Sequence, residues 1–151
     1  MLLQARDRLI AKVPRSHLEF LRRMAWCDDR AVTFAPGRVV CVHAGLDVNR
    51  PAELQLAALQ RRDPFDPDVL KPGCAGRIMA FSERNFCVPM HPDLDGNALL
   101  ISGHHGFTKV TGGRFIIDAS GGNPDTDAKT IDAVVLPDRT LYDSAGRFRS
   151  V

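Results

Sequence analysis

The spacing of apolar positions predicts two helices in the first part of the chain. In "VPRSHLEFLRRMAW", residues 13–26, Ser16 stands three residues before Glu19, which is the pattern of an N-terminal capping box. Apolar residues then recur at helical spacing, at Leu18, Leu21, Met24 and Ala25. A second helix is predicted in "RPAELQLAALQRR", residues 50–62, with Pro51 near its first turn and two arginines at its end.

The remaining apolar runs predict strands. A continuous β-branched run in "GRVVCVHAGL", residues 37–46, is typical of a buried strand that ends in a loop at His43. Prolines and glycines then interrupt every period over residues 63–97, apart from a short element at 78–81, so we expect a long crossover there. The last part of the chain predicts four or five mainly antiparallel, meandering strands, in "ALLISG", "FTKV", "RFIIDAS", "TIDAVVLPD" and "TLYDSAG", with a hairpin at Gly112-Gly113.

Composition indicates a single soluble domain. A chain of 151 residues with 44% hydrophobic content is expected to form one domain, 1–151, with a sizeable core. Its 20 Lys and Arg and 18 Asp and Glu are scattered, so no nucleic-acid partner is indicated. No stretch suits a signal peptide or a membrane span, so we expect no membrane partner and a cytoplasmic location, with the nucleus as the alternative. The four cysteines, Cys27, Cys41, Cys74 and Cys87, form no C-x-x-C pair and are expected to be reduced structural thiols.

Two histidines stand at the ends of predicted strands. His43 follows the first buried run and His104 follows a later one, and each has a glycine within the next two residues. Such strand ends suggest one shared site, because a glycine lets backbone or ligand approach closely. A hydrogen-bonded loop histidine would explain either residue alone, and their spacing fixes no geometry. The pattern therefore leaves a metal site and a polar turn both open.

The sequence resembles a known family of metal-dependent enzymes. "VVCVHAGL" and "LLISGHHG" resemble the two C-terminal metal-ligand motifs of the calcineurin-like metallophosphoesterases, which include the phosphoprotein phosphatases. Together with "VPRSHLEFLRRMAW", "RFIIDASGGNPD" and "AVVLPD", they resemble the C-terminal half of the Rhizobiales-like phosphatases over nearly the whole chain. The resemblance implies an α/β fold, half of an α/β/β/α sandwich with a mainly antiparallel C-terminal sheet. It also implies that His43 and His104 bind the second metal ion and that His105 does not.

The implied function is metal-dependent hydrolysis of a phosphomonoester on a protein, with phosphotyrosine favoured among the substrates. In the intact family domain, two divalent ions, Mn, Fe or Zn, activate a water and neutralise the phosphate oxygens. Two alternatives stay open. One is a diadenosine-tetraphosphate-type hydrolase, which shares the V-H-A-G and G-H motifs. The other, from a different class, is a non-catalytic interaction module or pseudophosphatase.

The family's N-terminal motifs, G-D-x-H-G, G-D-x-x-D-R-G and G-N-H-[DE], do not occur in these 151 residues. In the family they supply the first metal's ligands, a bridging aspartate and the histidine acid. We therefore expect a truncated form or one half of a split protein, with no catalytic residue of its own and no activity alone. Such a half is expected to expose apolar strand faces, for example at 39–42 and 115–117, and to bind a missing N-terminal half or self-associate.

Three further residues are candidates near a bound phosphate. Arg61 and Arg62 lie roughly where the family carries a phosphate-clamping arginine, although an exposed helix end explains them as well. Asp118 ends the run "RFIID" and could accept the second N–H of a ligand imidazole. The loop at 123–125 would face the same presumed phosphate cleft. Its residues are equally typical of an ordinary turn.

Overall fold

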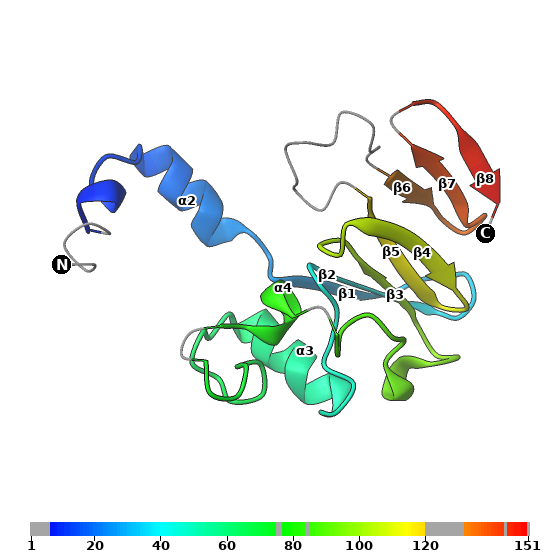
Figure 1. Cartoon of the computed structure of the whole chain (residues 1–151), viewed down its shortest axis with the longest axis horizontal. Coiled ribbons are helices and arrows are strands. Elements are labelled where there is room, and N and C mark those ends of the chain that lie inside the picture. The colour runs from blue at the N-terminus through cyan, green and yellow to red at the C-terminus, as the bar shows by residue number, and fades with distance from the viewer. Residues whose placement is uncertain (1–6, 75–76, 84, 120–131, 144, 151) are drawn as a thin grey trace.

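The computed structural model of the protein describes residues 7–74, 77–83, 85–119, 132–143 and 145–150. The predicted loop at 123–125 lies outside them. The elements follow in chain order (Figure 1): α2 (Arg15–Arg23), β1 (Cys27–Ala31), β2 (Arg38–Val42), α3 (Ala52–Arg61), α4 (Met79–Ser82), the 3-10 helix η1 (Pro92–Leu94), β3 (Leu99–Ser102), β4 (Phe107–Thr111), β5 (Arg114–Asp118), β6 (Asp132–Val135), β7 (Thr140–Asp143) and β8 (Phe148–Ser150). In the part of the chain so described, no helix is long and apolar enough to cross a membrane.

Two sheets make up the strand part of the fold. The larger sheet has the order β1-β2-β3-β5-β4, and the smaller has the order β6-β7-β8. In the larger sheet β2, β3 and β5 run parallel, while β1 and β4 pair antiparallel at its two edges. The predicted mixed α/β fold with mainly antiparallel pairing is therefore confirmed. The predicted meander is wrong for β3, because the crossover after β2 makes β3 parallel to β2. All four residues of β3 are buried, as is typical of a strand inside a parallel sheet.

Alternate residues of β2 enter two different cores. Val40 and Val42 pack with α3 residues such as Leu56 in one cluster. Val39 packs on the other face of the sheet, in a cluster that includes Val134 of β6. In Figure 1, α3 and α4 accordingly lie on one side of the larger sheet and the smaller sheet lies on the other. The chain thus forms three layers, in the order helix, sheet and sheet.

These layers correct the expectation that strand faces at 39–42 and 115–117 are exposed. Val40, Phe115 and Ile116 are each 0% exposed, because α3 covers one face of the sheet and the smaller sheet packs on the other. The exposed apolar side chains lie mainly elsewhere, and those of α2 include Phe20, at 67%, and Leu21, at 56%.

Both predicted helices form, but they begin differently from the prediction. Pro14 is the N-cap of α2 and no side chain caps the helix, so the predicted capping box is wrong. Ser16 is already the second residue of the helix, because Pro14 fixes a backbone angle suited to the entry. α3 follows Pro51 and ends at Arg61, and its C-cap Arg62 has a left-handed backbone with φ 57°. No pattern predicted β1, whose sequence "CDDRA" has no apolar alternation.

The crossover and the hairpin complete the larger sheet. The crossover is packed rather than loose, and its buried apolar residues are Val69, Ile78, Met79, Ala80, Cys87 and Leu94. Its predicted short element at 78–81 is α4. The predicted hairpin joins β4 to β5, with Gly112 at φ +58°. Gly113 is needed for a close approach instead, because a Cβ there would lie 2.7 Å from the Ala98 carbonyl oxygen.

Candidate metal centre

Two histidines meet at the carboxyl ends of the inner strands β2 and β3 of the larger sheet. His43 directly follows β2 and His104 follows β3 after one glycine. Because β2 and β3 are parallel neighbours, their carboxyl ends lie at the same edge. Nε2 of His43 lies 3.1 Å from Nδ1 of His104, although the two residues are 61 positions apart. The structure therefore brings the two imidazoles together, as expected, whereas metal binding by this pair stays a prediction.

A tight turn aims the second imidazole. His104 has a left-handed backbone, with φ 68°, and the His105 N–H donates to the Gly103 carbonyl at 2.9 Å, which closes a γ-turn around His104. Oδ2 of Asp118 accepts the backbone N–H of His104 at 3.1 Å. Positive φ in a non-glycine residue is strained, and such strain clusters at functional sites. Asp118 thus supports the turn, whereas its predicted bond to a ligand imidazole stays a prediction.

His105 turns away from this pair. Its side chain is 5% exposed, and its Nε2 lies 2.6 Å from the Ala44 carbonyl oxygen. Ala44 is the residue after His43, so His105 links the two histidine loops from the buried side. The site therefore uses the "HH" pair asymmetrically, with one imidazole at the surface site and one in the interior.

The spacing of the imidazole pair suits a metal ion. Zinc–imidazole bonds of about 2.0–2.1 Å place two nitrogens of one tetrahedral site roughly 3–4 Å apart. A separation of 3.1 Å also allows a direct hydrogen bond between the rings, one donating and the other accepting. Among the residues that the structure describes, no group of three or more His, Cys, Asp and Glu could hold a metal ion. The pair therefore fits two positions of a coordination sphere and leaves the others to further ligands.

An apolar groove of about 490 Å³ adjoins His43. Trp26 and Phe81 meet edge to face in it, with ring centroids 5.2 Å apart, and the Phe81 ring lies 6.4 Å from that of His43. Leu21 of α2 and Met24, the C-cap of that helix, also line the groove. A flat apolar group could lie in this groove with a polar end at the imidazoles.

Arg61 and Arg62 lie at the end of α3 and have partners of their own. Arg61 donates to Asp66 at 2.5 Å. This hydrogen bond lowers the pKa of Asp66 below its usual range, because it outweighs the opposite effect of burial. Nη1 of Arg62 donates to the Arg22 carbonyl oxygen of α2. Both arginines border a second groove that also contains Leu18 and Trp26, rather than the His43 groove itself. Their predicted phosphate-binding role stays a prediction.

The sequence pattern missed one buried residue next to the histidine loops. Arg114 begins β5 and is 1% exposed, although an arginine after two glycines resembles an exposed turn residue. Burial lowers its pKa to about 10, so the guanidinium remains protonated at neutral pH. It packs against Gly45, where a Cβ would lie only 2.3 Å from the Cys87 carbonyl oxygen and the backbone has φ +131°. The glycine of "VHAGL" is thus required for this close packing. That glycine is the sequence feature that could have indicated a close approach at this position.

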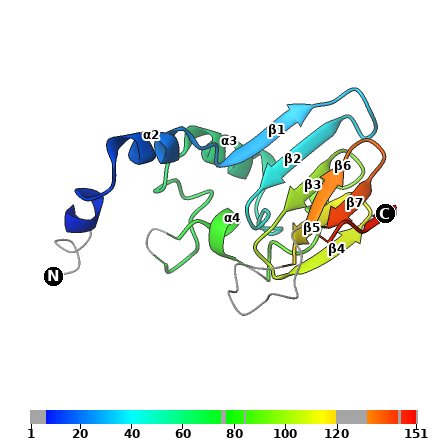
Figure 2. The same cartoon turned by 90° about the horizontal axis from the view of Figure 1, so that it is seen from above.

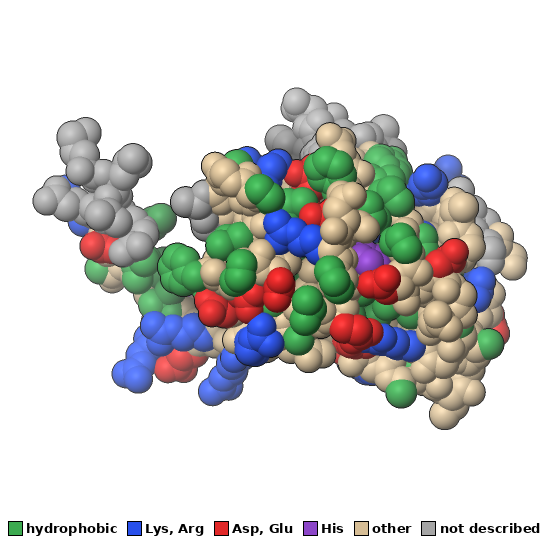
Figure 3. Space-filling model, turned by 90° about the horizontal axis from the view of Figure 1, so that it is seen from below, with side chains coloured by type: hydrophobic (Ala, Val, Ile, Leu, Met, Phe, Trp, Pro, Cys, Tyr) green, Lys and Arg blue, Asp and Glu red, His purple; other side chains and the backbone are tan. Residues whose placement is uncertain are grey.

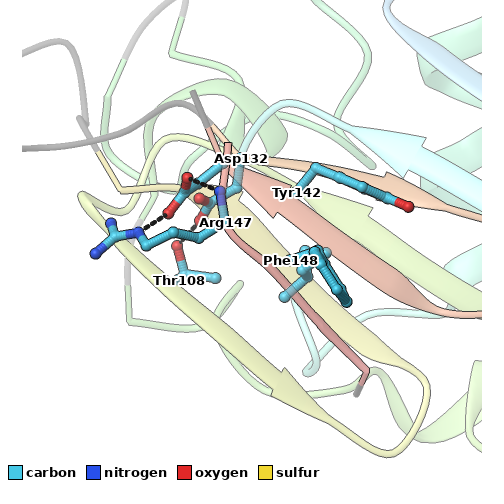
Figure 4. Close-up of a pocket in the computed structure, with 7 residues that line it drawn as sticks. Thr108, Asp132, Tyr142, Arg147 and Phe148 are labelled. Atoms are coloured by element: carbon cyan, nitrogen blue, oxygen red, sulfur yellow. Dashed lines mark hydrogen bonds and ion pairs between the residues drawn. The ribbon is translucent and has the colours of Figure 1, made fainter. Parts of the chain in front are cut away.

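A separate polar hollow lies between β4 and the smaller sheet (Figure 4). Thr108 of β4 donates to Asp132 of β6, and Arg147 forms an ion pair with Asp143 at 2.7 Å. These charged and polar groups therefore satisfy one another. The hollow carries none of the histidines or arginines predicted for the metal site.

No protein-family model matches the chain, and no curated protein matches it.

Proposed function

We propose that this chain contributes His43 and His104 to a divalent-metal site of a phosphomonoesterase that acts on phosphoproteins. The observation that carries the proposal is the 3.1 Å separation of Nε2 of His43 and Nδ1 of His104. The resemblance of their two motifs to the calcineurin-like phosphoesterases supports the same pair. When bound there, a Mn, Fe or Zn ion would supply Lewis-acid stabilisation of phosphate oxygens and activation of a water.

The arrangement of layers supports the finer fold that the proposal requires. α3 and α4 on one face of a sheet and a second sheet on its other face correspond to three of the four layers of an α/β/β/α sandwich. The parallel strands β2 and β3 bring the two histidine loops together at one edge. In the proposed enzyme, that edge is where the phosphate lies.

The groove beside His43 supports phosphotyrosine among the possible substrates. A phosphate held at the imidazoles would place its ester group over the space next to Trp26 and Phe81. Aromatic rings stack favourably edge to face or offset, and add about 0.5–1.5 kcal/mol beyond the apolar area they bury. A phenyl ester therefore gains more from this groove than an aliphatic one.

The described residues do not supply the charge that two divalent ions need. Neutral imidazoles cannot bridge two cations, and carboxylates normally do so. We infer that the chain alone turns over an aryl phosphate no faster than the variant in which His43 and His104 are both alanine. Full activity would then require carboxylates from another segment or partner.

The test is zinc binding measured by isothermal titration calorimetry. We expect the wild-type chain to bind Zn²⁺, and His43→Ala and His104→Ala to remove most of that binding. His17→Ala is the matched control, because His17 is an exposed histidine on α2, away from the imidazole pair. The proposal fails if His43→Ala binds Zn²⁺ as the wild type does, or if His17→Ala weakens binding to the same extent.

A non-catalytic interaction module is the second candidate, favoured by the exposed apolar side chains of α2. Phe20 and Leu21 of α2 are 67% and 56% exposed, its C-cap Met24 is 48% exposed, and large exposed apolar patches commonly mark interaction surfaces. Figure 3 shows hydrophobic side chains on the left part of the molecule, on the side where α2 lies in Figure 1. This function predicts that the zinc titrations of wild type and His43→Ala are the same.

A further inference from the structure

Arg114 is a buried cation whose partners are unusual. Within the described part of the chain it has no carboxylate partner. Burying a guanidinium is costly unless its N–H groups are all satisfied, and an apolar residue would often serve stability as well. Its five N–H donors instead meet the carbonyl oxygens of Ala44, Cys87, Val88, Leu100 and Phe115 and the hydroxyl of Ser102.

One nitrogen of Arg114 connects the two histidine loops. Nη2 lies 3.3 Å from the carbonyl oxygen of Ala44, the residue after His43. The same Nη2 lies 2.7 Å from Oγ of Ser102, two residues before His104. The guanidinium is planar and rigid, so it fixes the distance between the groups it binds.

Two other contacts also connect the two histidine loops, and one of them shares an acceptor with Arg114. The Gly103 N–H donates to the His43 carbonyl at 2.8 Å. Nε2 of His105 lies 2.6 Å from the Ala44 oxygen that also accepts from Arg114. The loops are thus joined from the buried side, directly beneath the imidazoles.

We infer that Arg114 is a positioning residue that sets the separation of the His43 and His104 imidazoles and thereby the metal affinity of the site. The effect on affinity rests on the proposed function, whereas the effect on the imidazole separation does not. Nη1 binds the Leu100 and Phe115 carbonyls within the sheet, and Nε binds the Val88 carbonyl in the crossover. The positioning acts through Nη2.

The first measurement needs no metal. The ring centroids of His43 and His104 are 4.9 Å apart, close enough for a nuclear Overhauser effect between their ring protons. We expect this effect in the full wild-type chain, its loss in Arg114→Met, and partial retention in Arg114→Lys, which keeps a buried donor. Arg38→Met is the matched control, because Arg38 begins β2 at the end away from His43 and pairs with Asp29 and Glu53. It should keep the effect.

The second measurement is Zn²⁺ affinity by calorimetry. Removing groups that orient ligand residues typically weakens metal binding about 10–100-fold, which is the loss expected for Arg114→Met. Arg114→Lys should lose less and Arg38→Met should bind as the wild type does. Ser102→Ala is the milder variant should Arg114→Met not fold. It removes one end of the Nη2 bridge and should weaken Zn²⁺ binding several-fold.

The two measurements separate the two ideas. A folded Arg114→Met that keeps both the Overhauser effect and the wild-type Zn²⁺ affinity overturns the positioning role, and so does an unfolded Arg114→Met together with a Ser102→Ala that keeps both. A wild type that binds no Zn²⁺, with an Overhauser effect that Arg114→Met loses, leaves the positioning role standing and overturns the proposed function.

Discussion

The helices α2 and α3 are similar in length and the sequence predicts both, yet their surroundings differ completely. α3 buries five residues, Ala52, Gln55, Leu56, Ala58 and Leu59, whereas α2 buries none. In two views at right angles, α2 extends away from the larger sheet (Figures 1 and 2). The difference shows that periodicity predicts a helix and its apolar face, but not which surface that face contacts.

The difference matters for the site because α3 is bonded to the loop after His43. Oε1 of the buried Gln55 accepts the Asp47 N–H at 2.8 Å, and its Nε2 donates to the Asp47 carbonyl at 2.9 Å and to the Arg50 carbonyl at 3.0 Å. These bonds satisfy a polar side chain that would otherwise be costly to bury. α3 therefore supports the His43 loop, while α2 only borders the groove beside it.

Leucine truncation in each helix should give the largest contrast between them. Leu56→Ala on α3 is expected to lower the free energy of unfolding by about 3 kcal/mol, because Leu56 is 2% exposed and its removal leaves a cavity. Leu21→Ala on α2 should cost less than about 0.5 kcal/mol, because Leu21 is 56% exposed. Urea unfolding followed by circular dichroism measures both. Equal losses would mean that α2 is packed in solution.

Local patterns in the sequence predicted local structure well. The run at 38–42 predicted β2 and its end at His43, because continuous β-branched residues suit a strand buried on both faces. β1 was missed because its Asp28 and Asp29 are held by Arg30 and Arg38 rather than by apolar packing. The Asp28–Arg30 pair lies within β1 and the Asp29–Arg38 pair joins β1 to β2, and neither leaves a periodic signal.

The candidate site was predicted in part. The sequence suggested one shared site because both histidines follow strands, and the structure places nitrogens of the two imidazoles 3.1 Å apart. The parallel pairing of β2 with β3 could not be predicted, because it depends on a crossover that the sequence pattern did not resolve. Nor could the role of Arg114, since its acceptors come from four separate segments of the chain.

Removing an ion pair next to α3 should also lower the free energy of unfolding more than removing one on α2, but by a smaller margin than the leucine truncations. Arg38 donates to both carboxylate oxygens of Asp29 at 2.8 Å and also to Glu53 in the first turn of α3. Arg38→Met is expected to lower the free energy of unfolding by about 1 kcal/mol, because bidentate pairs are the stronger kind. Arg15 pairs with Glu19 within α2 and is 92% exposed, so Arg15→Met should cost about 0.3 kcal/mol. Urea unfolding decides this too, and a larger cost at Arg15 would contradict it.

The last expected effect is a pH dependence of stability on the α3 side of the sheet, which comes from Cys27 of β1. The Cys27 thiol lies 3.9 Å from the Leu56 carbonyl oxygen, and burial, followed by the charges of Asp29 and Asp28, raises its pKa from 9.0 to about 11. Above pH 9.0 the unfolded thiol loses its proton while the folded one keeps it, so the unfolded state binds fewer protons and stability falls as the pH rises toward 11.

The stability difference between wild type and Cys27→Ala should therefore be smaller at about pH 10.5 than at about pH 8. Leu21→Ala is the control, because leucine does not titrate. The stability difference between wild type and Leu21→Ala should therefore be the same at both pH values. Urea unfolding at the two pH values measures both differences. If the Cys27→Ala difference is constant, the thiol is not shielded beneath α3, and the close packing that distinguishes α3 from α2 does not extend to β1.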